Sequence, residues 1–254
     1  MTALTIEELT KSYESNDGEK ERVFNGINVT VEDGSFTTVM GPSGCGKSTL
    51  LNIVAALVDI NGGIIKQDGK AINQNEIEYA YVFQDPRLLE WKTVEENIKF
   101  ALRAKGIPSD QHDELVEKYL EMVELAGEGD SYPLRLSGGM RQRVGIARAL
   151  AVESDLVLMD EPFGSLDEIT AQKLRDDVMD LWKETGKTVL FVTHNISEAV
   201  YMSDKIIFLN DSGEVFKRKI VDVERPRDSR NPELIELEYE LEDDLFSQMS
   251  DDNG

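Results

Sequence analysis

The sequence predicts an α/β fold with a mainly parallel sheet, an antiparallel β subdomain at the N-terminus and an inserted helical subdomain. Three observations lead to this prediction. Short strand-like segments separated by turns fill the first 83 residues, and amphipathic helical patterns fill residues 88–136. Helices then alternate with apolar strands as far as residue 209. This alternation is typical of βαβ units, whose strands pair in parallel.

The N-terminal third is predicted to contain short strands at residues 4–13, 23–31, 35–40, 62–68 and 79–83. The first is interpreted as an edge strand, and a polar hairpin at residues 14–19 separates it from the second. Asp68 and Gly69 form a turn between the last two strands. These elements make up the predicted antiparallel subdomain and the first strand of the parallel sheet.

Helical periodicity begins after residue 88. Thr93 is a candidate cap for a helix that Gly106 ends, and Ser109 opens a second helix. Beyond the insert, we expect helices at 140–152, 168–185 and 197–203, and strands at 156–159, 188–193 and 205–209.

A glycine-rich loop joins the strand at 35–40 to an apolar helix. Its residues are Gly41, Pro42, Ser43, Gly44, Cys45, Gly46, Lys47, Ser48 and Thr49. The glycines let successive backbone N–H groups point at an anion, and the following helix adds its positive dipole end. In this pattern Lys47 is expected to reach the β- and γ-phosphates, and the Ser48 hydroxyl to hold Mg²⁺. The sequence therefore predicts a nucleoside triphosphate site, and the helix N-terminus is expected to lower the pKa of the Cys45 thiol.

Two carboxylates follow the apolar strand at 156–159. A continuous apolar strand is buried on both faces, so Asp160 and Glu161 are expected at the carboxyl edge of the sheet, where ligands bind. Asp160 would support Mg²⁺ there, directly or through water, and Glu161 would accept a proton from an attacking water. The structural alternative is a strand that ends in ordinary acidic loop residues.

A second anion-binding helix start is expected at Ser137, Gly138 and Gly139. Ser137 is a favourable N-cap, the glycines allow close approach of a backbone, and a helix follows at once. The same residues would make an ordinary capped helix, and the pattern alone favours this plainer interpretation.

The segment from Leu136 to Arg143, LSGGMRQR, resembles the signature of the ATP-binding-cassette (ABC) ATPases, which is far more specific than the phosphate loop. Further family motifs occur in the family's order: Tyr13 as the aromatic that stacks on adenine, Gln84 as the Q-loop, Ser165-Leu166-Asp167 as the D-loop, and His194 as the switch histidine. The resemblance covers residues 4–216 and implies the fold of an ABC cassette. Residues 88–98 and 194–204 are similar to ATPases of nitrate, sulfonate and taurine importers, from which Glu90 and Asn195 depart.

The resemblance implies an ATPase on the cytoplasmic face of the membrane that energises solute uptake. Two copies would face each other, so that the phosphate loop of one and Ser137–Gly139 of the other enclose each ATP, with Asp167 among the binding residues. Mg²⁺ would be held by Ser48, Gln84 and Asp160, and the catalytic residues would be Glu161, His194 and Gln84.

The same resemblance implies partners beyond the second copy. These are two transmembrane permease subunits and, indirectly, an extracytoplasmic solute-binding protein. Leu88, Leu89 and Trp91 are apolar for a connecting loop and are candidates for contact with a permease. Packing into the helical insert is the alternative for each of them.

The composition of the chain argues against several other classes of protein. A net charge of −23 offers no basic surplus for a nucleic-acid partner. One cysteine and two histidines do not supply a disulfide framework or a Cys/His zinc site. No apolar run has the length of a membrane span and the N-terminus has no signal-peptide pattern, so we expect a cytoplasmic protein.

We expect a cassette at residues 1–220 with its helical insert at 88–136, followed by an acidic C-terminal extension at 221–254. Nine of the 50 acids lie in residues 231–254, and the remaining 41 still exceed the 27 lysines and arginines. The surface is either adapted to a salt-rich cytoplasm or merely acidic with a loose tail.

Several alternatives stay open at this stage. An ABC ATPase with a soluble assembly role is the second functional hypothesis, whereas a plain P-loop kinase or GTPase would leave the signature unexplained. Tyr13 would also fit as an ordinary strand aromatic, and His194 as a satisfied core histidine.

Overall fold

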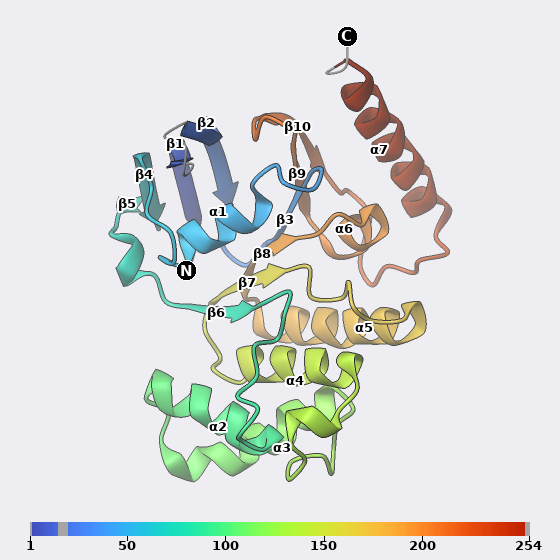
Figure 1. The fold of residues 1–254 in the computed structure, drawn as a ribbon. Coiled ribbons are helices and arrows are strands. Elements are labelled where there is room, and N and C mark those ends of the chain that lie inside the picture. Colours follow the sequence, from blue (N-terminus) through green and yellow to red (C-terminus); the bar gives the residue numbers. More distant parts are fainter. Residues whose placement is uncertain (1, 15–19, 252–254) are drawn as a thin grey trace. The chain divides into compact units, whose positions relative to one another are not determined.

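The computed structural model describes residues 2–14 and 20–251. The chain forms two compact units (Figure 1): unit 1 comprises Met1–Ile77 and Thr188–Gly254, and unit 2 comprises Glu78–Lys187. Within the described ranges, no helix is both long enough and apolar enough to cross a membrane.

Unit 1 begins with an antiparallel sheet. Its strands are β1 (Leu4–Glu14), β2 (Lys20–Val31), β4 (Gly62–Gln67) and β5 (Lys70–Ala71). β1 pairs with β2 on one side and with β4 on the other, and β5 pairs in turn with β4. This sheet confirms the predicted N-terminal subdomain, whereas the predicted hairpin at 14–19 lies outside the described residues except for Glu14.

The other strands of unit 1 are β3 (Phe36–Met40), β8 (Thr188–Val192), β9 (Lys205–Leu209) and β10 (Val215–Ile220). β3 lies between β8 and β9 and is parallel to both. Every residue of these three strands is buried, which explains their apolar and β-branched sequences. β10 was not predicted, because it is an antiparallel edge strand that carries Lys217, Arg218 and Lys219.

The helices of unit 1 are α1 (Lys47–Val54), α6 (Ile196–Met202) and α7 (Pro232–Asp251), and a 3-10 turn spans Gln74–Glu76. Residues 231–254 were assigned to an acidic extension from their charge alone, and helix α7 was not predicted. The helix nevertheless has a buried apolar stripe of Leu234, Leu237 and Leu241, which packs in one core cluster with residues of α6 and β9. The acidic segment is therefore a packed part of unit 1 as far as residue 245.

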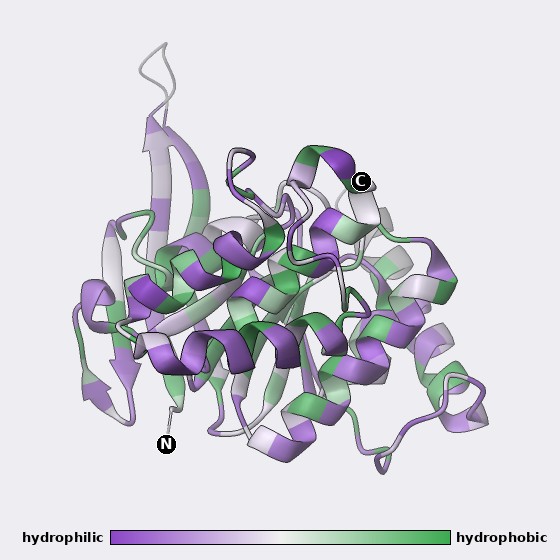
Figure 2. Ribbon diagram, turned by 90° about the horizontal axis from the view of Figure 1, so that it is seen from below, coloured by the Kyte–Doolittle hydropathy of each residue, from purple (hydrophilic) through white to green (hydrophobic). Residues whose placement is uncertain are grey.

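Unit 2 contains two parallel strands, β6 (Tyr79–Val82) and β7 (Leu156–Asp160). Its helices are α2 (Val94–Lys105), α3 (His112–Met122), α4 (Gly138–Leu150) and α5 (Glu168–Thr185), with 3-10 turns at Ser109–Gln111 and Pro133–Arg135. Hydrophobic and hydrophilic residues are interspersed along the helices (Figure 2), as in helices that bury one face.

Local capping sets the helix boundaries of unit 2. Thr93 caps α2 in a capping box with Glu96, and Gly106 ends this helix in the left-handed conformation, as predicted. Ser109 opens a 3-10 turn, so that α3 begins three residues later than expected.

Candidate nucleotide-binding site

The phosphate loop of unit 1 ends at a helix whose N-terminus is open. Gly46 is the N-cap of α1, has a φ of 103° and offers no side-chain hydrogen bond to the helix. A Cβ on Gly46 would lie 2.6 Å from Val23 Cγ1 and 2.8 Å from the Phe24 ring, so only glycine fits the close packing against β2. Gly46 thus places no side chain over this helix start, where backbone N–H groups can bind an anion.

The Lys47 side chain is folded back onto the loop that precedes it. Its ammonium donates hydrogen bonds of 2.8 Å to the carbonyl oxygens of Gly41 and Pro42, and the residue is buried. These bonds hold a positive charge at the beginning of the glycine-rich loop. Such a charge complements the phosphates of a bound nucleotide.

The structure contradicts the prediction for Cys45. The residue is 3 % exposed, and a Cβ on Gly41 would lie only 2.8 Å from its Sγ, so that the thiol is packed against the first residue of the loop. Burial raises the pKa of Cys45, and this effect outweighs the opposing charge of Lys47. The expectation of a lowered pKa was wrong, because it considered the helix N-terminus and not the desolvation of the thiol.

His194 follows β8 and is exposed beside the phosphate loop. It lines a cavity of about 310 Å³ together with Pro42 and Ser43 of that loop. The lining of this cavity also includes Phe216 of β10 and Leu245 of α7. His194 is therefore not buried in the core, and it can approach a phosphate held by the loop.

Tyr13 lies near the end of β1 with 40 % of its surface exposed. The ammonium of Lys11 lies 4.6 Å from the centre of its ring and donates a hydrogen bond to the carbonyl oxygen of Asp59. An exposed aromatic ring of this kind is available to stack on a base. Its role with adenine stays a prediction.

The two carboxylates of unit 2 end β7 with different exposure. Asp160 is buried, whereas Glu161 is partly exposed and has a φ of 43°, an unusual value for a residue other than glycine. The side-chain amide of Gln84 donates a hydrogen bond of 3.0 Å to Glu161 Oε2. Two of the predicted catalytic residues thus lie together, just beyond β6 and β7.

Mg²⁺ prefers oxygen donors. Unit 2 offers the amide oxygen of Gln84 and the carboxylate oxygens of Asp160 and Glu161, and α1 offers the hydroxyl of Ser48. Within the described ranges, no group of three or more His, Cys, Asp and Glu residues forms a metal site by itself. This chemistry fits Mg²⁺, which usually takes only a few protein ligands and binds through phosphates and water as well.

The signature residues of unit 2 form an exposed helix start. Ser137 Oγ accepts a hydrogen bond of 3.2 Å from the N–H of Met140, which confirms Ser137 as the N-cap of α4. A Cβ on Gly138 would lie 3.9 Å from the nearest side-chain atom, whereas one on Gly139 would lie 3.1 Å from Leu166. Gly138 therefore borders open space, and Gly139 is packed against the predicted D-loop.

Asp167, which the resemblance placed among the nucleotide-binding residues, is the N-cap of α5. It accepts a hydrogen bond of 3.1 Å from the N–H of Thr170, and bonding to Thr170 lowers the pKa of its carboxyl group. Its role toward a nucleotide stays a prediction.

The hydrogen bonds around His194 were not predicted from the sequence. Asn195 is the N-cap of α6 and accepts from the N–H of Glu198, three residues on. This N-x-x-E spacing is the signal of a capping box and would have identified the pair. Asn is among the most favourable N-cap residues, which fits the place of Asn195 at the start of α6.

The strand, the phosphate loop with its lysine and the open helix start define a P-loop nucleoside triphosphatase. The profile of the ABC transporter family matches residues 24–164. The chain is 44 % identical to an uncharacterized ABC transporter ATP-binding protein of Methanocaldococcus jannaschii, over 94 % of this chain and 89 % of that protein. It is 46 % identical to the taurine import ATP-binding protein TauB of Escherichia coli K12, over 76 % of each chain.

A solved structure extends this comparison. The dimeric ATP-binding cassette MJ0796, in a post-hydrolysis state with ADP and Pi, matches 87 % of this chain and all of its own with a TM-score of 0.78 and 32 % identity. The chain belongs to the ABC transporter family. It is an ATP-binding subunit of that family with the fold of an ABC cassette, and an ABC-type ATPase.

Proposed function

We propose that this chain hydrolyses ATP for an importer of a small solute of the nitrate, sulfonate or taurine type. The observation that carries the proposal is the identity of 46 % with the taurine import protein TauB. The phosphate loop with Lys47 and the paired Gln84 and Glu161 support the hydrolytic part of it. Such a subunit would act at the cytoplasmic face of the membrane, bound to its permeases.

In this proposal the phosphates of ATP bind the backbone N–H groups from Gly41 to Thr49, and Lys47 balances the charge that develops during transfer to water. Glu161 accepts the proton of the attacking water, and His194 hydrogen-bonds the γ-phosphate or holds Glu161 and the water in line. Ser48, Gln84 and Asp160 would hold Mg²⁺. The metal would supply neutralisation of the phosphate charge.

We propose further that two copies share each ATP, with Tyr13 on the adenine and Ser137–Gly139 of the second copy on the γ-phosphate. The dimer of the related cassette MJ0796 supports this arrangement. The exposed N-terminus of α4 also supports it, because Gly138 borders open space where a ligand of another chain can approach.

A groove of about 320 Å³ in unit 2 supports a permease partner. Pro86, Leu88, Pro133 and Leu134 provide its apolar lining. Leu134 is 73 % exposed, and Trp91 is exposed to the same extent. Charged residues complete the lining of the groove, and large exposed apolar side chains such as Leu134 are typical of a surface that binds another protein. A solute-binding protein outside the cell would deliver the solute to these permeases.

The permease part can be tested by copurification from membranes of the source cells. We expect the tagged chain to retain a protein with several membrane-spanning helices, and Leu134→Glu to abolish this association. Leu57→Glu is the matched control, since Leu57 is an exposed leucine of unit 1. Retention of soluble proteins alone would favour the assembly function instead. Equal retention of the membrane protein by both variants would reject this groove as the docking surface.

A further inference from the structure

Three hydrogen bonds join the two neighbours of His194, Thr193 and Asn195, to each other and to Glu198 in the first turn of α6. The Thr193 hydroxyl donates to Glu198 Oε2 over 2.6 Å. The same hydroxyl oxygen accepts from the backbone N–H of Asn195 over 3.0 Å, and Asn195 Oδ1 accepts from the N–H of Glu198 over 3.2 Å. The residues immediately before and after His194 are therefore both held by this network.

The bond between Thr193 and Glu198 is buried, although His194 is exposed. Thr193 is 1 % exposed and Glu198 is 5 % exposed. Hydrogen bonds to a carboxylate are short and strong, and they are strengthened further where water is excluded. The first turn of a helix also favours a negative charge. Glu198 is thus a buried carboxyl group in the first turn of α6, four residues after His194, that the proposed mechanism does not use.

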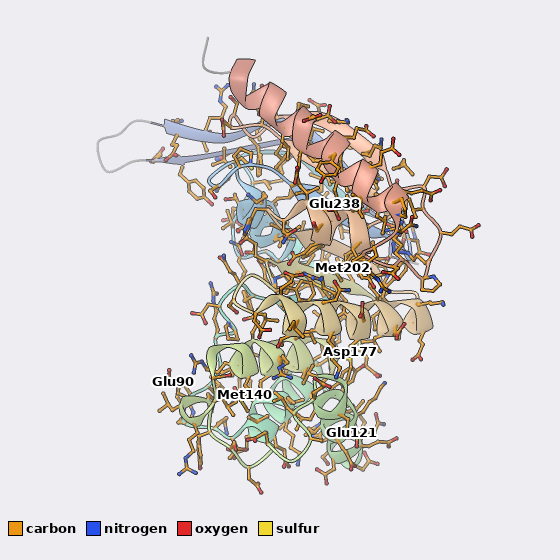
Figure 3. All side chains as sticks on the ribbon, turned by 90° about the vertical axis from the view of Figure 1, so that its right-hand side faces the viewer. Glu90, Glu121, Met140, Asp177, Met202 and Glu238 are labelled. Carbon is orange, nitrogen blue, oxygen red and sulfur yellow. The ribbon has the colours of Figure 1, made fainter. Side chains whose placement is uncertain are left out.

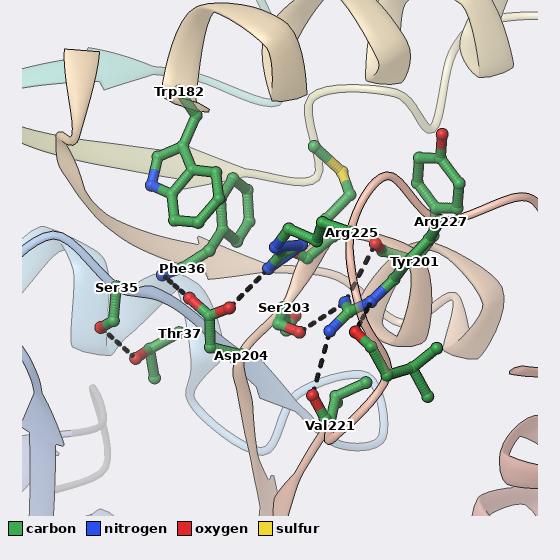
Figure 4. Close-up of polar contacts among 12 residues, drawn as sticks. Ser35, Phe36, Thr37, Trp182, Tyr201, Ser203, Asp204, Val221, Arg225 and Arg227 are labelled. Carbon is green, nitrogen blue, oxygen red and sulfur yellow. Dashed lines mark hydrogen bonds and ion pairs between the residues drawn. The ribbon is translucent and has the colours of Figure 1, made fainter. Parts of the chain in front are cut away.

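The far end of α6 is fixed by an arginine of the C-terminal segment (Figure 4). Arg227 is buried, and its guanidinium donates to the carbonyl oxygens of Val200, Tyr201 and Ser203 over 3.0, 3.1 and 2.6 Å. It also donates to the carbonyl oxygen of Val221. A cation in this place satisfies the last carbonyl groups of a helix and complements its dipole.

α7 supports α6 from the side. Its leucine stripe packs in one core cluster with Ala199 and Val200 of α6, and Glu238 lies on the side of α7 toward α6 (Figure 3). Glu238 of α7 hydrogen-bonds Ser197 in the first turn of α6, although burial still raises the pKa of this glutamate. The helix that holds Glu198 is therefore anchored at its end and along its side.

We propose that Glu198 is a positioning residue for His194. Through the Thr193 hydroxyl it sets the backbone on both sides of His194, and thereby the direction from which the imidazole approaches the phosphate loop across the cavity that they share. This inference rests on the proposed role of His194 in ATP hydrolysis. Glu198 itself touches no reacting atom in this proposal.

The test uses Thr193→Val, which has nearly the same shape but neither donates nor accepts a hydrogen bond. We expect its kcat for ATP to fall at least tenfold while the KM changes little, since small misplacements of a catalytic group lower rates by up to about a hundredfold. Thr193→Ser and Glu198→Gln keep the hydrogen bond and should retain most of the activity. Glu198→Ala should resemble Thr193→Val.

The matched control is Thr188→Val at the opposite end of β8. Thr188 is also 1 % exposed, and its hydroxyl oxygen accepts a hydrogen bond of 2.9 Å from the N–H of Gly34. This variant removes an equally buried threonine hydroxyl away from His194. It should lower the unfolding temperature about as much as Thr193→Val does, but leave kcat near that of the unchanged protein.

A readout independent of activity is available, because the sequence contains only two histidines. The imidazole signals of His112 and His194 can be followed by NMR in the full chain. In Thr193→Val the His194 signal should shift or broaden, whereas that of His112, which is buried in unit 2, should not. Thr188→Val should change neither signal.

The outcomes distinguish the proposed role of His194 in hydrolysis from the proposed positioning role of Glu198. If His194→Ala leaves kcat unchanged, the proposed role of His194 fails and this inference fails with it. If His194→Ala lowers kcat but Thr193→Val changes neither kcat nor the His194 signal, only the positioning role of Glu198 is overturned. An equal loss of kcat in Thr193→Val and Thr188→Val would show a structural effect alone and overturn it as well.

Discussion

The amide of Gln84 donates a hydrogen bond to Glu161 and so connects the ends of the two parallel strands of unit 2. Both residues lie just beyond the paired strands, and the positive φ of Glu161 interrupts the extended conformation of β7 one residue after Asp160. Unusual backbone conformations persist where the surrounding structure enforces them, often at functional sites. We therefore interpret Glu161 as a carboxylate whose orientation is fixed by its backbone conformation and by Gln84.

Glu161→Gln should slow ATP hydrolysis by about 10² to 10⁴, because an amide cannot accept the proton that a general base removes. The affinity for ATP should be nearly unchanged, since the side-chain shape and a hydrogen-bond acceptor toward Gln84 remain. Steady-state hydrolysis and equilibrium binding of ATP measure the two effects. Glu153→Gln is the matched control, because Glu153 is another glutamate of unit 2 with a positive φ. Equal loss in both variants would speak against Glu161 as the base.

The Cys45 thiol should react slowly with maleimide in the native chain. Its pKa is raised from the ordinary value of 9.0, so the reactive thiolate is scarce at neutral pH, and its burial blocks access as well. The folded chain favours the neutral thiol. Below about pH 9, where the thiol is neutral in the unfolded chain as well, this group does not oppose folding. As the pH rises through the raised pKa, the stability that the neutral thiol contributes is lost. Labelling at pH 7 in the native and the denatured chain compares the two states. Equal rates would contradict the burial of Sγ.

Most of the fold could be predicted from the sequence, because periodicity and capping residues act locally. Helix α5 was expected at the residues where it lies, and the caps Thr93 and Ser137 were identified from their spacing to the following helix. β10 and α7 were missed for one reason. Their sequences are dominated by charged residues. Only the packing of these elements on β9 and α6 shows that the apolar residues between the charges are buried.

The chemistry of the site was less predictable than its location. The phosphate loop motif identified Cys45 as a loop residue, but the direction of its pKa shift depends on burial, which no motif encodes. The contact between Gln84 and Glu161 joins residues 77 positions apart, so local patterns carry no information on it. The cap formed by Asn195 and Glu198 was within reach of the N-x-x-E spacing, whereas the bond between Thr193 and Glu198 has no such local signal.

Leu241→Ala should destabilise the protein by about 2–5 kcal/mol, the usual range for removing a buried leucine side chain from a core. Leu241 is fully buried where α7 packs in the cluster with α6 and β9. Tyr239→Ala on the same helix is the control, since Tyr239 is 66 % exposed and its removal should change stability by no more than about 0.5 kcal/mol. Urea unfolding of both variants tests the comparison. Similar small effects would indicate that α7 is a loose tail.

The shared ATP site predicts complementation between two inactive variants. Lys47→Ala removes the charge that the phosphate loop holds, and Ser137→Arg places a bulky side chain at the exposed start of α4. Each homodimer carries one defect in every site and should retain almost no ATP. In a mixed dimer, one site contains both defects. The other site pairs Lys47 of the Ser137→Arg chain with Ser137 of the Lys47→Ala chain and is intact.

Nucleotide trapping in a tethered mixed dimer that also carries Glu161→Gln makes this measurable, because slow hydrolysis preserves the bound ATP. Trapping avoids the question of whether turnover requires two working sites. We expect about one ATP per mixed dimer, since only one of its two sites is complete. If the signature served the ATP of its own chain, each chain would keep its own defect and mixing would restore nothing. A folded mixed dimer that retains no ATP would therefore reject the shared site.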